Sequence, residues 1–296
     1  MARDVGEENA GRMDDVTEMS FAPTAFQRTH VPKDADAELA ALLFVLDLQA
    51  ALPSVQRIRD WVLDVLAPQP GETAVDVGSG TGSEVVRLAR LVGPGGRAVG
   101  VEPQSALRAE AVRRAAGTTA EFTDGDALAL PFDDGSVHVL RCERVWQHLD
   151  DPDQAAREVA RVLAPSGRAA IVDSDWATAV VHPGDPDVHR RLNEAMRRRM
   201  PNALSGRYLR IRLQAAGLEV DADIGSTALV MPDEFLARPV MLGVSADLAV
   251  EEGAIARAEA DELLGAVSDA AGRGEAFMSV TMFAAVARKL VRPLDH

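Results

Sequence analysis

An apolar run that ends in three alternating glycines constrains the fold of this chain more than any other feature. Residues 74–77 (Ala-Val-Asp-Val) predict a buried strand, and Gly78-Ser79-Gly80-Thr81-Gly82 separates it from an amphipathic helix. Glycine suits this place because the chain turns sharply between strand and helix, and because a side chain would keep a ligand away from the backbone. The pattern therefore predicts an α/β fold with a cofactor-binding loop after its first strand.

The residue types around the glycines distinguish between two kinds of cofactor loop. Asp76 would accept hydrogen bonds from the loop amides or act on a positively charged ligand, whereas a pyrophosphate loop has few acids near the anion. The dinucleotide fingerprint G-x-G-x-x-G also requires a third glycine at position 83, which is serine here. An NAD-dependent oxidoreductase is therefore the less favoured alternative.

The G-x-G-x-G spacing resembles the first motif of class I S-adenosylmethionine-dependent methyltransferases. Three later segments resemble further motifs of that family in the same order, over residues 70–175. The resemblance implies a Rossmann-like seven-stranded mixed α/β sheet with helices on both faces, N-terminal helices and a helical cap. It implies S-adenosylmethionine as methyl donor and S-adenosylhomocysteine as product, and it is nearest to bacterial quinone and secondary-metabolite (type 11-like) methyltransferases.

The family motifs assign candidate residues for each part of the cofactor. Glu102 ends the second predicted strand, about twenty residues after the glycines, where a carboxylate accepts both ribose hydroxyls. The alternative is a surface acid at the start of a helix that begins with Pro103. By the resemblance, Asp126 accepts from the adenine amino group, with an Asx turn as its alternative. The implied cofactor-binding residues are Asp76, Gly78, Ser79, Gly80, Gly82, Glu102, Pro103, Asp126, Ala127 and, through its main chain beside the ammonium group, Arg141.

The acceptor side is predicted from the end of the fifth strand, residues 168–173. Ligands bind outside the carboxyl ends of parallel strands, so residues 174–182 should border the acceptor site. Trp146 and Trp176 would stack on a planar acceptor, with simple packing as the alternative, and Asp175 would bind an acceptor hydroxyl. The acids here have no third ligand at a recognisable spacing, so no metal site is predicted.

Methyl transfer from a sulfonium requires chiefly that the acceptor atom be aligned with the methyl group. An acceptor hydroxyl or acidic carbon would be helped by a general base, and histidine is the usual choice. His148 follows the fourth strand and is the first candidate, although a structural role at the start of the next helix is the alternative. His182 is the second candidate and His30 the third.

Composition limits the classes of partner. A net charge of -15 argues against nucleic acid and anionic membranes, and 47% hydrophobic residues are enough for a full core. The single cysteine excludes an internal disulfide and a cysteine-based zinc site. No signal peptide or membrane span is evident, so we expect a cytoplasmic protein with a small-molecule substrate and, as one option, a homodimer.

The domain organisation follows from shifts in composition. Residues 1–35 are predicted as a tail or lid that includes Phe21 and Phe26, and residues 36–296 as one methyltransferase domain. Its cofactor half is 70–175, and its acceptor-side insertions are 176–216 and 233–273. The first insertion carries an arginine-rich helix, which would either hold an acidic substrate or form a solvated face.

We therefore expect methyl transfer to an oxygen or carbon of a small organic acceptor, in secondary metabolism. Two alternatives stay open. A protein of this fold can keep the cofactor as a scaffold for a cyclisation or another non-methyl reaction, or it can bind ligands without catalysis. The sequence does not identify the acceptor, because pocket loops diverge while the cofactor loop does not.

Overall fold

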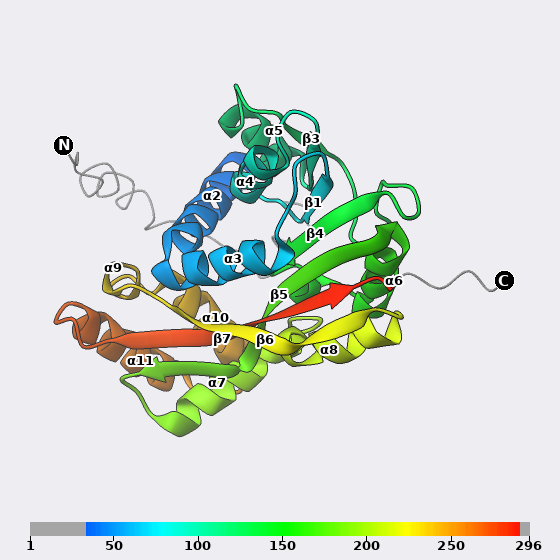
Figure 1. Ribbon diagram of the computed structural model, residues 1–296. Helices are drawn as coiled ribbons and strands as arrows, with labels where there is room; N and C mark the ends of the chain where they lie inside the picture. The colour runs from blue at the N-terminus through cyan, green and yellow to red at the C-terminus, as the bar shows by residue number, and fades with distance from the viewer. Residues whose placement is uncertain (1–33, 291–296) are drawn as a thin grey trace.

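The computed structural model describes residues 34–290 and is built around a seven-stranded sheet with strand order β3-β2-β1-β4-β5-β7-β6 (Figure 1). Neighbouring strands from β3 to β5 run parallel, and β7 is antiparallel to both β5 and β6. This confirms the predicted seven-stranded mixed sheet, in which the last strand, β7, is the antiparallel one. The strands are β1 (Thr73–Val77), β2 (Arg97–Val101), β3 (Ala120–Thr123), β4 (Val137–Glu143), β5 (Leu163–His182), β6 (Glu219–Val230) and β7 (Phe277–Arg288).

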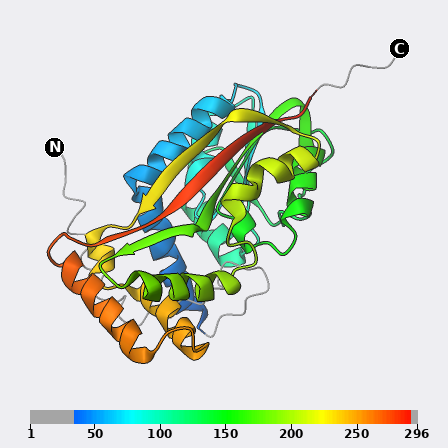
Figure 2. The same ribbon diagram turned by 90° about the horizontal axis from the view of Figure 1, so that it is seen from below.

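Helices cover both faces of the sheet, as the resemblance implies (Figure 2). On one face α3 packs against β5, β6 and β7, and α4 against β1, β2 and β3, while α6 and α8 cover the opposite face. The helices are α2 (Ala35–Ala51), α3 (Pro53–Leu66), α4 (Ser83–Val92), α5 (Ser105–Arg114), α6 (Pro152–Val162), α7 (Pro186–Arg198), α8 (Ser205–Ala215), α9 (Asp233–Leu236), α10 (Val240–Glu251) and α11 (Arg257–Ala271), with a 3-10 turn η2 (Trp146–His148) after β4. The central parallel strands are thus buried on both sides, which explains their continuous apolar sequences.

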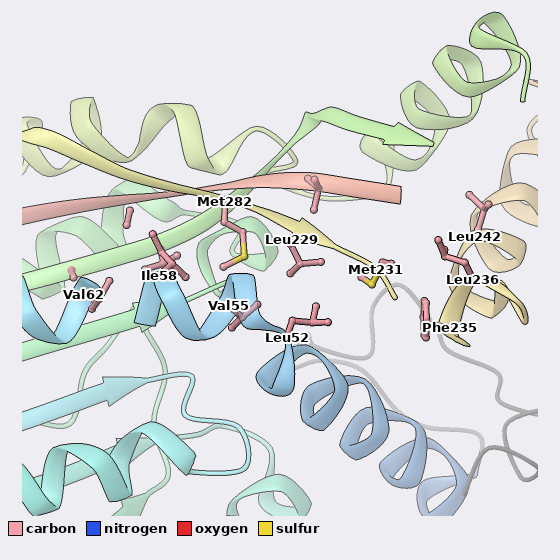
Figure 3. Close-up of a cluster of buried hydrophobic side chains, with 14 of the residues drawn as sticks. Leu52, Val55, Ile58, Val62, Leu229, Met231, Phe235, Leu236, Leu242 and Met282 are labelled. Carbon is pink, nitrogen blue, oxygen red and sulfur yellow. The ribbon is translucent and has the colours of Figure 1, made fainter. Parts of the chain in front are cut away.

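The core on the α3 face shows why this helix forms where it does. Val55, Ile58 and Val62 recur at helical spacing and are buried against the sheet. Figure 3 shows them on the side of α3 that faces Leu229 and Met282 of β6 and β7. Burial of each such side chain contributes about 1.5–3 kcal/mol. The amphipathic α3 is therefore fixed across the sheet beside the glycine loop.

The cap beyond the strands belongs to the same core. Phe235 and Leu242 are buried in one cluster with Met231, and Met241 packs against it (Figure 3). Phe235, Met241 and Leu242 belong to the segment 233–273, which was predicted as an acceptor-side insertion. The structure places Phe235 and Leu242 in the core.

The N-terminal helices α2 and α3 meet at Pro53. Pro53 is the first residue of α3, where its missing N–H needs no partner, and the axes of α2 and α3 differ by 71°. Asp47 of α2 accepts a hydrogen bond of 2.9 Å from Arg114 of α5, which holds α2 beside the cofactor half. The lid candidates Phe21, Phe26 and His30 lie outside the described residues.

Within residues 34–290, no single helix is long and apolar enough to cross a membrane, although α2 and α3 taken together meet the criteria of length and composition. The strongest departure from the predicted elements is β5. It continues past the expected end at Asp173 as far as His182, because its second half pairs antiparallel with β7 through Val180, Val181 and His182. Much of the segment expected to border the acceptor is therefore strand.

Candidate functional site

The glycine loop between β1 and α4 has the backbone that its sequence requires. Gly78, Gly80 and Gly82 have φ angles of 70°, 52° and 83°, in the region that L side chains rarely adopt. A Cβ on Gly78 would lie 2.3 Å from the Val145 side chain, and one on Gly82 would lie 2.5 Å from the ring of Phe122. Glycine is thus needed for both conformation and space.

Glu102 is the acid that contacts the loop. Its Oε2 accepts from the Gly80 amide at 2.9 Å, and its Oε1 accepts from the Gln104 amide at 2.9 Å. Burial raises the pKa of Glu102, and the two backbone hydrogen bonds oppose that rise. The loop is also fixed to β2 by the amides of Gly78 and Ser79, which donate to the Val101 carbonyl at 2.8 and 3.1 Å.

Pro103 is not the first residue of the next helix, since α5 begins at Ser105 with Gln104 as its N-cap. The alternative in which Glu102 merely precedes a helix started by Pro103 therefore loses its structural basis. The carboxylate lies instead between the end of β2 and the glycine loop, the position at which a Rossmann-like fold presents an acid to a ribose. Its role toward ribose hydroxyls remains a prediction.

Asp76 faces a buried ion network, and its carboxylate accepts from the Arg141 guanidinium rather than from a loop amide. It lies opposite Arg141 in the β1–β4 register, and Arg141 Nη1 donates to Asp76 Oδ1 at 3.1 Å. Arg141 Nη2 donates to Glu143 Oε2 at 2.6 Å, and Arg59 of α3 donates to both oxygens of Glu143 at 2.8 and 2.9 Å. Glu84 of α4 completes the network at 3.7 Å from Arg59 and 3.9 Å from Arg141.

The network gives different pKa values to Asp76 of β1 and Glu143 of β4. Burial raises the pKa of Asp76 to about 7, although Arg141 opposes the rise. Burial also disfavours ionisation of Glu143, but Arg59 and Arg141 outweigh it and hold its pKa at about 2. The network joins β1, β4, α3 and α4 directly beneath the loop. Arg141 and Glu143 are two positions apart in β4, so their side chains point to the same face of the sheet. This spacing was the sequence signal that could have shown that the two charges lie together.

The segment after β3 carries the candidates for adenine. Asp126 Oδ1 accepts from the Leu128 amide at 2.9 Å, which is the Asx turn that the sequence offered as the alternative. Ala127, next in the chain, is 8% exposed. The adenine role of this segment stays a prediction.

Arg144 links the end of β4 to α2. Its φ of 56° is uncommon for a non-glycine residue, and such strain concentrates at functional sites. Its amide donates to the Val172 carbonyl at 2.7 Å, and its guanidinium donates to Gln49 of α2. Leu46 of the same helix lies near Gly80. The helix α2 thus covers the loop, although the predicted lid lay further toward the N-terminus.

The acceptor candidates lie just after the end of β4 and in the middle of β5. Asp173 is fully buried, and its Oδ2 accepts from the Gln147 amide at 2.8 Å. The indole Nε1 of Trp176 donates to Gln147 Oε1 at 2.7 Å. Trp146 is 1% exposed and packs in the hydrophobic core, so the structure supports packing for it and not stacking on an acceptor.

Asp175 is committed to structural contacts. It is 1% exposed, its Oδ1 accepts from Arg207 Nη2 at 2.9 Å, and the Ala177 amide donates to it at 3.1 Å. Its proposed contact with an acceptor hydroxyl therefore competes with a formed ion pair. Asp173 was considered beside Asp175 as a ligand for an acceptor hydroxyl, whereas Gln147 was not predicted, because its amide reaches Asp173 from a segment that is separate in sequence.

The two histidine candidates lie apart. His148 is in η2 at the end of β4, where burial and the nearby Arg144 guanidinium lower its pKa to about 4 and keep it neutral near pH 7. His182 is exposed at the far end of β5, opposite Phe277, roughly 20 Å beyond Asp175 at ~3.3 Å per residue. The two candidates for a general base therefore lie in different parts of the molecule, and the catalytic role of either stays a prediction.

Comparisons with known proteins agree with this geometry. The family model described as "Methyltransferase domain" matches residues 75–171. An uncharacterized 37.1 kDa protein in transposon Tn4556 of Streptomyces fradiae is 30% identical over 82% of this chain and 70% of its own length. The ubiquinone/menaquinone biosynthesis C-methyltransferase UbiE of Ruegeria sp. is 32% identical over 53% of this chain and 68% of its own length. Other quinone methyltransferases are matched over 52–63% of their length.

Solved structures share the fold at lower identity. Phosphoethanolamine N-methyltransferase 2 of Haemonchus contortus, in complex with S-adenosylmethionine, has a TM-score of 0.53 and 18% identity over 86% of this chain and 57% of that protein. The [4+2]-cyclase SpnF has a TM-score of 0.50 and 23% identity over 80% of this chain and 82% of that protein. Together with the glycine loop and the sheet order, these matches show that the chain belongs to the class I S-adenosylmethionine-dependent methyltransferases.

Proposed function

We propose that this methyltransferase transfers its methyl group to an oxygen or carbon atom of a small organic acceptor of quinol or phenol type, in secondary metabolism. The observation that carries the proposal is the 32% identity to UbiE, whose name describes C-methylation in quinone biosynthesis. A quinol has an acidic hydroxyl and an electron-rich ring carbon, and both are suitable nucleophiles for a sulfonium methyl group.

The donor would lie along the carboxyl edge of β1, β2 and β4. These residues fit S-adenosylmethionine because Gly78, Gly80 and Gly82 have no side chain that would keep a ligand from the loop backbone. In addition, a carboxylate oxygen of Glu102 can accept more than its one backbone hydrogen bond. Glu102 would hold the ribose hydroxyls, the segment of Asp126 and Ala127 the adenine, and the Arg141 main chain the ammonium group. When bound, S-adenosylmethionine supplies an electrophilic methyl group.

The chain's own contribution would be alignment more than proton transfer. His148, with its pKa near 4, is a weaker base than a histidine poised near neutrality. Asp173 accepts from the Gln147 amide, and the Gln147 side chain accepts from the Trp176 indole. These two hydrogen bonds would fix the position of the side chains that an acceptor would contact. An aligned quinol with an acidic hydroxyl reacts readily without a strong base.

The first experiment is calorimetric titration with S-adenosylmethionine, S-adenosylhomocysteine and NAD, followed by turnover with hydroquinones and catechols. We expect binding of both sulfur ligands, no binding of NAD, and S-adenosylhomocysteine formed in equal amount with a methylated product. Binding of NAD alone would contradict the assignment of the loop.

A second candidate function is a cyclisation in which the cofactor is a scaffold. Its support is that SpnF, a structure titled as a [4+2]-cyclase, has the same fold. The two functions differ in one measurement. A scaffold reaction converts its substrate while S-adenosylmethionine is bound but not consumed, and methyl transfer consumes one donor for each product.

A further inference from the structure

A cavity of ~490 Å³ lies between the C-terminal end of α7, the loop that follows it and α8, along the lower side of the molecule in Figure 1. Three arginines line it, namely Arg197, Arg198 and Arg212, with Tyr208 and a single acid, Glu194. In a chain with a net charge of -15, this concentration of cations around one cavity is unusual. The arginine-rich helix that the sequence singled out contributes two of them.

The charges around this cavity, which we call the α7–α8 cavity, are only partly neutralised. Arg198 pairs with Glu252 at 3.0 Å, and Glu194 pairs with Arg190 at 3.2 Å. Arg197 forms no ion pair with any residue in 34–290. The cavity therefore keeps an excess of positive charge that a ligand would neutralise.

Arg212 has a donor without an acceptor. Its Nε lies 3.2 Å from Asp153 of α6, its Nη2 donates to Asn202 at 3.3 Å, and its guanidinium lies 5.4 Å from the centre of the Tyr208 ring. Its Nη1 is buried, and no residue that the structure describes accepts from it. Because Nη1 is closed off from the cavity as well, an anion would meet the partly exposed guanidinium of Arg212 chiefly through its positive charge.

We propose that the α7–α8 cavity binds the carboxylate or phosphate group of a small anionic ligand. Guanidinium groups are suited to both anions, since they present several donors in a plane and remain charged at any physiological pH. Arg197 supplies the unbalanced charge, and Arg212 adds the positive charge of its guanidinium at the wall. This chemistry is separate from that of the glycine loop, so the proposal does not depend on the acceptor.

One loop, which contains Asn202 and Ala203, separates the cavity from the acceptor side. The wall of the cavity includes Asn202 and Ala203, and on the other side of this loop Asn202 donates to the Gln147 carbonyl at 3.1 Å. The Trp176 amide donates to the Ala203 carbonyl at 2.9 Å. An anion in the α7–α8 cavity therefore fixes the loop that supports Gln147 and Trp176.

The test is calorimetric titration of the full chain with inorganic phosphate and, separately, with succinate, at an ionic strength held constant with sodium chloride. We expect one saturable site, and we expect Arg197→Gln and Arg212→Gln each to weaken binding at least about tenfold, the scale of a charge-assisted hydrogen bond. Stronger binding of phosphate identifies a phosphate ester as the ligand class, and stronger binding of succinate identifies a carboxylate.

The control is Arg273→Gln, which removes one charge from an exposed pair with Glu275 and should leave anion binding unchanged. Arg212 also contacts Asp153, so Arg197→Gln decides the question if the Arg212 variant folds poorly. Absence of saturable binding, or equal weakening in all three variants, would overturn the proposal. Each variant is also titrated with S-adenosylmethionine, whose unchanged affinity separates this site from the donor site.

Discussion

Replacement of Arg141 by methionine probes the buried ion network beneath the glycine loop. Arg141 is 2% exposed, and its guanidinium lies 3.1 Å from Asp76 and 2.6 Å from Glu143. Methionine has a similar length but no charge. In the variant, Glu143 keeps Arg59 as a partner, whereas Asp76 loses the cation that it contacts directly.

The expected loss of stability follows from this geometry. Removal of one partner from a buried ion pair costs ~3–5 kcal/mol, because the remaining charge stays buried without compensation. For a chain of this size each kcal/mol lowers Tm by roughly 2–4 °C, so the variant should melt roughly 6–20 °C below the parent protein.

The loss should also depend on pH in a definite direction. Burial already raises the pKa of Asp76 from 3.8 in the unfolded chain to about 7, so its ionisation weakens the folded state as pH rises through this range. Arg141 opposes that rise, and without it the pKa of Asp76 increases further. At pH 6, Asp76 is protonated in the folded variant, so no unpaired charge is buried. At pH 8.5, the folded variant either keeps a proton on Asp76 at a cost in free energy or buries a carboxylate without its cation. The loss of stability in the Arg141→Met variant relative to the parent protein should therefore be larger at pH 8.5 than at pH 6.

Urea unfolding followed by circular dichroism at both pH values measures this difference. Arg97→Met is the matched control, since its pair with Glu121 is about half exposed and should contribute ~0–1 kcal/mol. Addition of Asp76→Asn to the Arg141 variant should recover part of the loss. The reasoning is refuted if the Arg141 variant loses no more than the Arg97 control, or if its loss is the same at both pH values.

Three further predictions concern the loop and its neighbours. Gly78→Ala should lose ~2–5 kcal/mol in thermal or urea unfolding, because its Cβ would meet Val145 at a positive φ; a Tm equal to the parent's would contradict the steric argument. Glu102→Ala should raise the calorimetric Kd for S-adenosylmethionine roughly 10–100-fold, since a charged hydrogen-bond acceptor is lost, and an unchanged Kd would remove Glu102 from the donor site. His148→Ala should leave that Kd within about twofold. The parent's kcat/KM should show no titration of His148 between pH 6 and 9, because its pKa lies near 4; an apparent pKa near 6.5 that disappears in the variant would show a conventional base.

The local sequence was sufficient for the elements with strong local signals. The glycine loop was predicted because only glycine takes positive φ at three alternating positions without strain, and the structure has all three in that region. The seven-stranded mixed sheet with helices on both faces was also predicted, from the ordered set of family motifs. These features depend on backbone conformation or on the order of motifs, and each can be recognised within the linear chain.

Contacts between distant segments were decided only by the tertiary structure. The length of β5 depends on its antiparallel partner β7, about one hundred positions later in the chain, so the strand continues where its own sequence suggested a loop. His182 was carried away from the site by that extension. The partner of Asp76 is Arg141 because strand register places them side by side, and Trp146 is buried because two layers close over it. The sequence by itself determined the cofactor loop and the fold class, since their signals are local; the site's charges and walls come from register and packing, which only the folded chain decides.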